Sequence, residues 1–178
     1  MTKHGKTVVL AFSGGLDTCF AVPYLRGKLG ARVVTVTVDT GGFSPAALDT
    51  LSARARRLGA ARHVTVDARR RVWDGFLSRI IQGNCLRGGV YPLCVSAERT
   101  AQAEVVVQIA RRERARAIAH GSTGAGNDQV RFDAAFGTLA PDLEILAPIR
   151  DLGISREEER RELARHGLVL PPKTSRYS

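Results

Sequence analysis

The chain has 178 residues, 44% hydrophobic and 25% charged, which is typical of one globular domain and excludes intrinsic disorder as its main state. No run approaches the ~18 consecutive apolar residues of a transmembrane helix, and the apolar run from Val8 to Phe12 is too short for a signal-peptide core, so we expect a cytoplasmic location. The net charge of +10 could attract nucleic acid, but the densest basic runs, Arg69–Arg71 and Arg111–Arg114, lack interleaved aromatic residues, so solvated helix faces are favoured over a nucleic-acid surface.

The first half of the chain alternates predicted strands with predicted helices. Lys6–Phe12 is a short apolar run that ends at a Ser-Gly-Gly turn, and Arg32–Val38 is almost wholly β-branched; both patterns indicate buried strands. Apolar residues at helical spacing predict a helix over Leu16–Leu29, which Pro23 can kink. The next predicted elements are a helix over Ser44–Leu58, a strand over His63–Val66 and a helix over Arg69–Ile81.

The second half continues the alternation after a glycine-rich segment, Gln82–Pro92, which we expect to be a loop. Ser96–Arg114 is a long amphipathic helix with apolar residues four apart. Ala117–Ala119 predicts a strand that leads into a second glycine-rich loop, Gly121–Gly126. The remaining predicted elements are a helix over Asn127–Leu139, a strand over Leu143–Leu146, a helix over Ser155–His166 capped by Ser155 and Glu158, and an extended tail over Leu170–Ser178.

Strands that alternate with helices predict right-handed βαβ units and a parallel sheet. The expected fold class is therefore α/β, a doubly wound parallel sheet with helices on both faces. We expect one domain over residues 1–170 and an extended tail over residues 171–178. The three cysteines, Cys19, Cys85 and Cys94, are an odd number without Cys-x-x-Cys spacing, so we expect reduced thiols rather than disulfides or a zinc site.

The segment from Ser13 to Thr18 lies between the first predicted strand and the first predicted helix. Backbone N–H groups at such a helix start bind anions, and glycine lets the chain approach phosphate oxygens. The segment lacks the lysine of a Walker A loop. Its hydroxyls and the carboxylate of Asp17 suit a phosphate group bound through Mg²⁺, with Asp17 as a direct or water-mediated ligand. The alternative is a tight turn in which Ser13 or Asp17 caps the helix.

The second glycine-rich loop follows the fourth predicted strand, and in an open parallel sheet it can face the same crevice as the first. On the following helix Asn127 and Arg131 are four residues apart and share a face, with Asp128 beside them. These groups can bind a zwitterion, because Asp128 accepts from an ammonium group and Arg131 donates to a carboxylate. The alternative is helix capping together with surface charge.

Two motifs resemble fingerprints of a known family. Residues 11–19, Ala-Phe-Ser-Gly-Gly-Leu-Asp-Thr-Cys, resemble the pyrophosphate-binding loop of the N-type ATP pyrophosphatases. Residues 120–132, His-Gly-Ser-Thr-Gly-Ala-Gly-Asn-Asp-Gln-Val-Arg-Phe, resemble the second fingerprint of argininosuccinate synthase, and the resemblance extends from about Val8 to Ser178. It implies a Rossmann-like HUP-type fold and a ligase of arginine biosynthesis, which activates citrulline with ATP, releases pyrophosphate and joins citrulline to aspartate.

The resemblance also implies binding residues, with ATP as substrate and Mg²⁺ as its metal ion. Those implied to line ATP are Ala11, Phe12, Ser13, Gly14, Gly15, Leu16, Asp17, Thr18, Cys19, Val38 and Gly121, with Asp17 also a ligand of Mg²⁺. Those implied to bind aspartate are Thr123, Asn127 and Asp128. Those implied to bind citrulline are Tyr91, Ser96, Asn127, Arg131 and Ser178. No protein nucleophile is implied, because a leaving pyrophosphate needs electrostatic stabilisation instead.

The chain departs from the family in two respects. Cys19 stands where the family's loop usually has serine, so a weak thiol donor replaces a hydroxyl. Family members also continue for about as many residues again, into a synthetase domain that completes the citrulline site and mediates tetramer formation. We therefore expect a homo-oligomer or a chain that needs the missing C-terminal half. Two alternatives stay open: a non-catalytic or partner-dependent ATP-binding module, and a tRNA-modifying relative.

Overall fold

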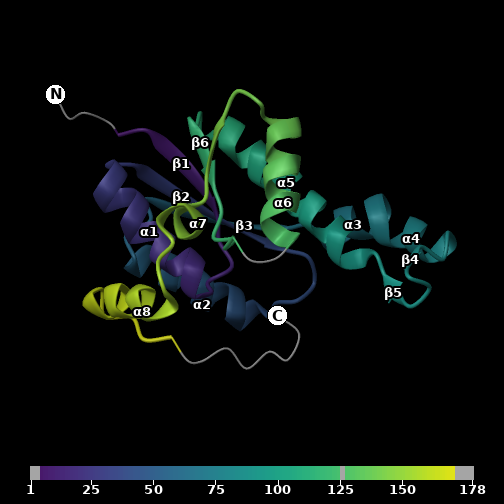
Figure 1. The fold of residues 1–178 in the computed structure, drawn as a ribbon, viewed down its shortest axis with the longest axis horizontal. Helices are drawn as coiled ribbons and strands as arrows, with labels where there is room; N and C mark the ends of the chain where they lie inside the picture. Colours follow the sequence, from purple (N-terminus) through teal and green to yellow (C-terminus); the bar gives the residue numbers. More distant parts are fainter. Residues whose placement is uncertain (1–4, 125–126, 171–178) are drawn as a thin grey trace.

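The computed structural model describes residues 5–124 and 127–170, which form a five-stranded parallel sheet with helices on both faces (Figure 1). The strand order is β3-β2-β1-β6-β7. The elements are β1 (Thr7–Ala11), α1 (Leu16–Leu29), β2 (Arg32–Asp39), α2 (Pro45–Arg57), β3 (Arg62–Asp67), α3 (Arg69–Val72), η1 (Trp73–Leu77), α4 (Ser78–Gln82), β4 (Leu86–Arg87), β5 (Tyr91–Pro92), α5 (Cys94–Arg112), β6 (Ala117–Ala119), α6 (Asn127–Leu139), β7 (Glu144–Leu146), α7 (Pro148–Leu152) and α8 (Arg156–Arg165). The predicted fold class is confirmed.

The first strand occupies the centre of the sheet, between β2 and β6. Leu10 pairs with Thr35 of β2 and with Ala119 of β6, so the carboxyl ends of these three strands lie side by side. From β1 the chain adds β2 and β3 on one side, and it later adds β6 and β7 on the other. Ligands of open α/β sheets bind where the strand order reverses in this way.

Alternate residues of β1 supply the cores on the two faces of the sheet, as the two-residue period of a strand requires. Val9 packs in one cluster with Val106 of α5 and Phe136 of α6. Leu10 packs in the other cluster with Leu25 of α1, together with residues of α2 and α8. Helices therefore cover both faces, which places the loop after β1 between two packed layers.

Most predicted boundaries agree with the structure to within two residues. The predicted helix over residues 69–81 contains a π-helical turn, η1, between α3 and α4. The segment expected to be a loop, residues 82–92, contains the antiparallel pair β4–β5. Helix α5 begins at Cys94 rather than at Ser96, and the short helix α7 was not predicted. The tail expected over residues 171–178 lies outside the described residues.

Residues 69–93, here called the arm, extend away from the sheet (Figure 1). Large apolar side chains of the arm are exposed, including Trp73, Ile81 and Val90. The base of the arm, α3 and η1, packs against α5, where Arg71 contacts Glu104 and Gln108. In the described part of the chain, no helix has both the length and the apolar character that a membrane span needs.

Candidate functional site

The first glycine loop, Ser13–Thr18, turns sharply from β1 into the first turn of α1. Gly14 has a φ of 72°, a conformation that favours glycine. Ser13 Oγ accepts a hydrogen bond from the Gly15 N–H group at 3.3 Å and lies 3.2 Å from the Thr18 hydroxyl. Gly15 occupies the cap position of α1, and no described side chain caps the helix, so the capping alternative for Ser13 or Asp17 is wrong. An uncapped helix start suits an anion.

The second glycine loop meets the first at Gly121. A Cβ atom at this position would lie 2.7 Å from Cγ2 of Thr18 and 3.0 Å from the Thr18 backbone nitrogen. Glycine is therefore required for the two loops to touch. The loops after β1 and β6 converge, as expected from a parallel sheet with these two strands adjacent.

His120 directly follows β6, and it links the second loop to α6. Its Nδ1 accepts a hydrogen bond from the Ser122 N–H group at 3.2 Å, so Nε2 carries the proton and donates to Asp133 at 2.9 Å. Arg150 of α7 donates to the other oxygen of Asp133 at 2.6 Å. Burial lowers the pKa of His120, although the Asp133 carboxylate acts in the opposite direction. The ring is 1% exposed, so a neutral His120 holds the loop.

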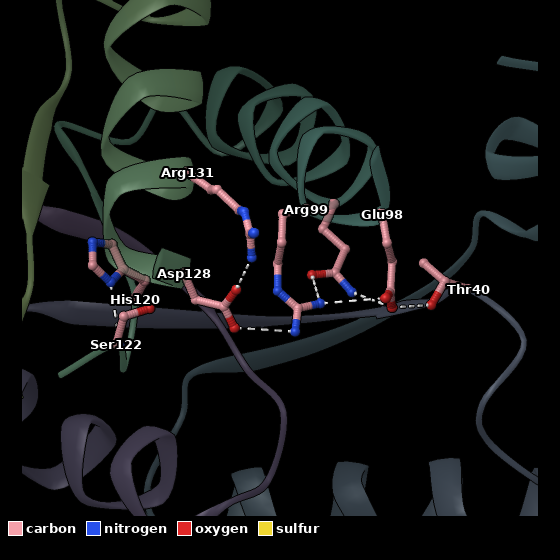
Figure 2. Close-up of polar contacts among 8 residues, drawn as sticks. Thr40, Glu98, Arg99, His120, Ser122, Asp128 and Arg131 are labelled. Atoms are coloured by element: carbon pink, nitrogen blue, oxygen red, sulfur yellow. Dashed lines mark hydrogen bonds and ion pairs between the residues drawn. The ribbon is translucent and has the colours of Figure 1, made fainter. Parts of the chain in front are cut away.

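At the start of α6, Asp128 lies between two guanidinium groups (Figure 2). It accepts hydrogen bonds from Arg131 at 3.0 Å and from Arg99 of α5 at 3.2 Å. Arg99 also lies 3.5 Å from Glu98, which accepts from the Thr40 hydroxyl at 2.6 Å. A polar network thus connects α6 with the segment after β2. Because Asp128 and Arg131 pair with each other, a zwitterionic ligand would replace this pair rather than meet two free groups.

The other predicted ATP residues lie at or beside the ends of the central strands. Ala11 ends β1, and Phe12, which follows it, is buried. Leu16 begins α1 and packs against the core, while Val38 is buried next to the last residue of β2. The structure therefore brings this set to one edge of the sheet.

The predicted citrulline and aspartate residues are more scattered. Thr123 lies in the second loop and Asn127 is exposed at the first position of α6. Tyr91 lies in β5, 55% exposed, and Figure 1 shows this strand far out on the arm. Ser96 lies in α5, where its side chain is not described, and Ser178 lies outside the described residues. The described geometry gathers Asn127, Asp128 and Arg131 but not Tyr91.

The thiol of Cys19 lies behind the first loop, inside the core between α1 and α2. It donates to the Gly14 carbonyl at 3.3 Å. Burial raises the pKa of Cys19 to about 12, against the opposing effect of the nearby Arg54. Cys19 is therefore a neutral, buried residue that contacts the loop from its interior side. A thiol can make this contact with the Gly14 carbonyl in place of a hydroxyl.

A second carboxyl group lies beside Asp17, and no motif or spacing predicted it. Glu159, on α8, lies close to Asp17 and is only 1% exposed. Burial, and then the negative charge of Asp17, raise the pKa of Glu159 to about 7. The closeness of the two carboxyl groups therefore favours a proton on Glu159 below about pH 7.

Glu159 and Arg99 were missed as site residues because each reaches the loops from an element distant in sequence. The glycine loops themselves were found because their residues are contiguous. His120 was found as the first residue of the second fingerprint, but its bond to Asp133 was not predicted. No spacing rule predicts that Glu159 reaches Asp17, since β2 to β7 all lie between α1 and α8 in the sequence.

A parallel sheet of this order, with a glycine loop after its central strand, defines a doubly wound α/β domain of the HUP type. A crystal structure of a 4-thiouridine synthetase–RNA complex with bound ATP matches it with a TM-score of 0.68 and 15% identity, over 91% of this chain and 41% of that one. At this identity the match establishes the fold alone.

Residues 7–168 match the Arginosuccinate synthase N-terminal HUP domain, and the chain belongs to this family. It is 46% identical over 171 residues to the argininosuccinate synthase of Pyrobaculum aerophilum and 42% identical over 171 residues to that of Sulfurisphaera tokodaii, matches that cover 96% of this chain and 43% of each relative. The enzyme of Dehalococcoides mccartyi (strain ATCC BAA-2266) is 43% identical over 164 residues, or 92% of this chain and 40% of the relative. The chain thus spans less than half the length of these relatives.

Proposed function

We propose that the chain is the ATP-binding domain of an argininosuccinate synthase, which condenses citrulline with aspartate. In this reaction the ureido oxygen of citrulline attacks the α-phosphorus of ATP, and pyrophosphate leaves. The amine of aspartate then attacks the ureido carbon of citrullyl-AMP, and AMP leaves to give argininosuccinate. The contact of Gly121 with Thr18 supports this most, because it joins two family motifs that lie far apart in the sequence.

In this proposal the pyrophosphate part of ATP binds at the first glycine loop. The uncapped start of α1 offers N–H groups and the positive end of the helix dipole, and the Ser13 and Thr18 hydroxyls lie 3.2 Å apart beside them. The backbone at Val38 and Gly121 would contact the nucleoside. Val38 lies in β2 and Gly121 follows β6, and these are the two strands that flank β1.

Asp17 would help to hold the Mg²⁺ ion of MgATP. Among the described residues, no group of three or more His, Cys, Asp or Glu side chains could hold a metal ion. A single carboxylate fits a Mg²⁺ ion that is bound mainly by phosphate oxygens and water. The ion would neutralise the charge of the leaving pyrophosphate. Asp17 would orient the ion, directly or through water.

The amino-acid substrates would bind beside the second loop. Thr123, Asn127 and Asp128 would bind aspartate, with Asp128 accepting from its ammonium group. Tyr91, Ser96, Asn127, Arg131 and Ser178 would bind citrulline. Tyr91 lies on the arm, away from α6. We therefore propose that the citrulline site is completed by residues equivalent to the part of the relatives that this chain does not span, in the same chain or in a partner copy.

The first test is calorimetric titration of the purified chain with MgATP. We expect binding, and an affinity at least about tenfold lower for Asp17→Asn, a change that keeps the side-chain shape and removes its charge. Asp49→Asn, exposed on α2, is the control and should bind as the wild type does. A folded chain without affinity for MgATP would overturn the proposed ATP site.

Pyrophosphate release separates a complete ligase from a partner-dependent module. Release that requires both citrulline and aspartate identifies a ligase that is complete in this chain. A folded, ATP-binding chain that releases none is a nucleotide-binding domain that needs the rest of the synthase. The coverage of 43% of the relatives' length favours the second result.

A further inference from the structure

We propose that Arg54 of α2 is a positioning residue of the ATP site, which locks the Gly14–Gly15 peptide so that the Gly15 N–H group points at the pyrophosphate. The inference rests on the proposed function and adds to it a residue outside both motifs. Arg54 lies 40 residues after Gly14 in the sequence. It belongs to a helix that contributes no other residue to the proposed site.

Helix α2 packs directly behind the first glycine loop. A Cβ atom on Gly14 would lie 2.0 Å from Cδ2 of Leu51 and 3.4 Å from Nη1 of Arg54. The half-buried Arg54 guanidinium donates from Nη1 to the Gly14 carbonyl at 2.7 Å. Because the donor is charged and the donor–acceptor distance is short, this bond is among the stronger types of hydrogen bond in proteins.

The Gly14 carbonyl receives both of its donors from the interior side of the loop. Besides Arg54, the fully buried thiol of Cys19 donates to it at 3.3 Å. A thiol is a weak donor, so Arg54 supplies most of the restraint. The carbonyl therefore points into the protein, toward α2.

The direction of this carbonyl determines the direction of the next N–H group. In a planar trans peptide the C=O and N–H groups point to opposite sides. The Gly15 N–H group accordingly points away from Arg54 and donates to Ser13 Oγ at 3.3 Å, on the side of the uncapped helix start. A bond of this length can be exchanged for a stronger one to a phosphate oxygen.

A lock on this peptide matters because both of its residues are glycine. Without side chains, a Gly-Gly peptide flips more easily than any other. After a flip, the Gly14 carbonyl oxygen would face the anion in place of the Gly15 N–H group, so attraction would become repulsion. The loop has no lysine to compensate for the lost donor.

The same helix offers a matched control. Arg57, three residues along α2, donates from Nη2 to the Gly167 carbonyl at 2.6 Å. That bond also joins a guanidinium to a main-chain carbonyl, but Gly167 follows α8 and belongs to neither glycine loop. Any effect that comes only from lost charge or from a weaker α2 should appear in both variants.

The experiment measures the affinity of the wild type, Arg54→Met, Arg54→Lys and Arg57→Met for inorganic pyrophosphate with Mg²⁺, together with the thermal midpoint of each. We expect Arg54→Met to bind about tenfold more weakly and Arg57→Met to bind within about twofold of the wild type. Arg54→Lys should recover part of the affinity, because an ammonium group can donate to the same carbonyl.

Unchanged affinity of Arg54→Met, or an equal loss in Arg57→Met, would overturn the role of Arg54 while leaving the ATP site in place. If Arg54→Met does not fold, Arg54→Lys is compared with Arg57→Lys: weaker binding by the first supports the proposal, and equal binding overturns it. A folded wild type that does not bind magnesium pyrophosphate would overturn the proposed function, and this inference with it.

Discussion

Glu159 is an acid buried where α8 packs against α1, and its Oε2 atom has no hydrogen-bond partner among the described residues. The folded protein raises its pKa from 4.5 to about 7, because burial and the neighbouring Asp17 both disfavour the charged form. Between these two values the folded state binds more protons than the unfolded state. The contribution of Glu159 to stability therefore falls as the pH rises through this window.

We predict that Glu159→Gln stabilises the chain at pH 8 by on the order of 1 kcal/mol, because glutamine stays neutral and can donate to Asp17. The gain should shrink as the pH falls from about 7 towards 4.5, because Glu159 becomes protonated in the folded state over this range. Urea unfolding at pH 5 and pH 8, with a chelator present, measures both values. Glu157→Gln, exposed on the same helix, should show no such dependence; an identical effect of Glu159→Gln at the two pH values would contradict the assignment.

At Gly121 there is no space for a side chain next to Thr18. We predict that Gly121→Ala lowers stability by about 1–3 kcal/mol and weakens MgATP binding, because its Cβ would lie 3.0 Å from the backbone nitrogen of Thr18, which cannot move without the first turn of α1. Gly27→Ala is the control: it lies inside α1 with nothing within 4 Å of the added atom, and it should be neutral or stabilising. Differential scanning calorimetry and titration measure the two effects, and equal behaviour of the variants would contradict the close approach.

At the scale of elements, α8 depends on its first turn. Ser155 accepts a hydrogen bond from the Glu158 N–H group at 3.3 Å, and Glu158 accepts from the Ser155 N–H group at 2.8 Å, so the predicted capping box is confirmed. We predict that Ser155→Ala costs about 1 kcal/mol of unfolding free energy in urea. Arg161→Gln, which removes only an exposed pair with Glu157, should cost less than about 0.5 kcal/mol. Equal losses would mean that the cap contributes nothing beyond surface charge.

The elements that could be predicted from the sequence are those with a long hydrophobic pattern or a clear helix cap. Arg32–Asp39 reads as a buried strand because almost every residue is β-branched, and seven of its eight residues are buried. The pair β4–β5 was missed because two-residue strands are too short to show alternation, and α7 because five residues show no helical period. In the site, contiguous loops were predictable, whereas Arg54, Arg99 and Glu159 act across tertiary contacts that no local spacing encodes.

Across the whole molecule, 27 basic side chains outnumber 17 acidic ones, and many of the acidic side chains form ion pairs with arginines. Glu113 accepts from both Arg32 and Arg62, at 2.9 Å and 2.6 Å, and these bonds, opposed by burial, lower the pKa of Glu113. Asp128 likewise pairs with two arginines. Much of the positive charge is therefore neutralised locally rather than gathered into a binding surface.

We predict that bulk tRNA is retained by the chain in a gel shift at low salt and released at about 150 mM salt, as expected for contacts to phosphate alone. The measurement is the fraction of tRNA bound across a salt series. Retention that persists at physiological salt would contradict this view and favour a tRNA-modifying relative.

The position of the arm has a consequence for chain connectivity. The arm lies between β3 and α5 in sequence and outside the five-stranded sheet in space. A break in the backbone at the β4–β5 turn would leave every hydrogen bond of that sheet in place, and the two pieces would remain joined along the β1–β6 ladder. Each piece would carry one glycine loop, so the nucleotide site would exist only in the reassembled pair. The two loops are thus the halves of a site that can be assembled from two fragments.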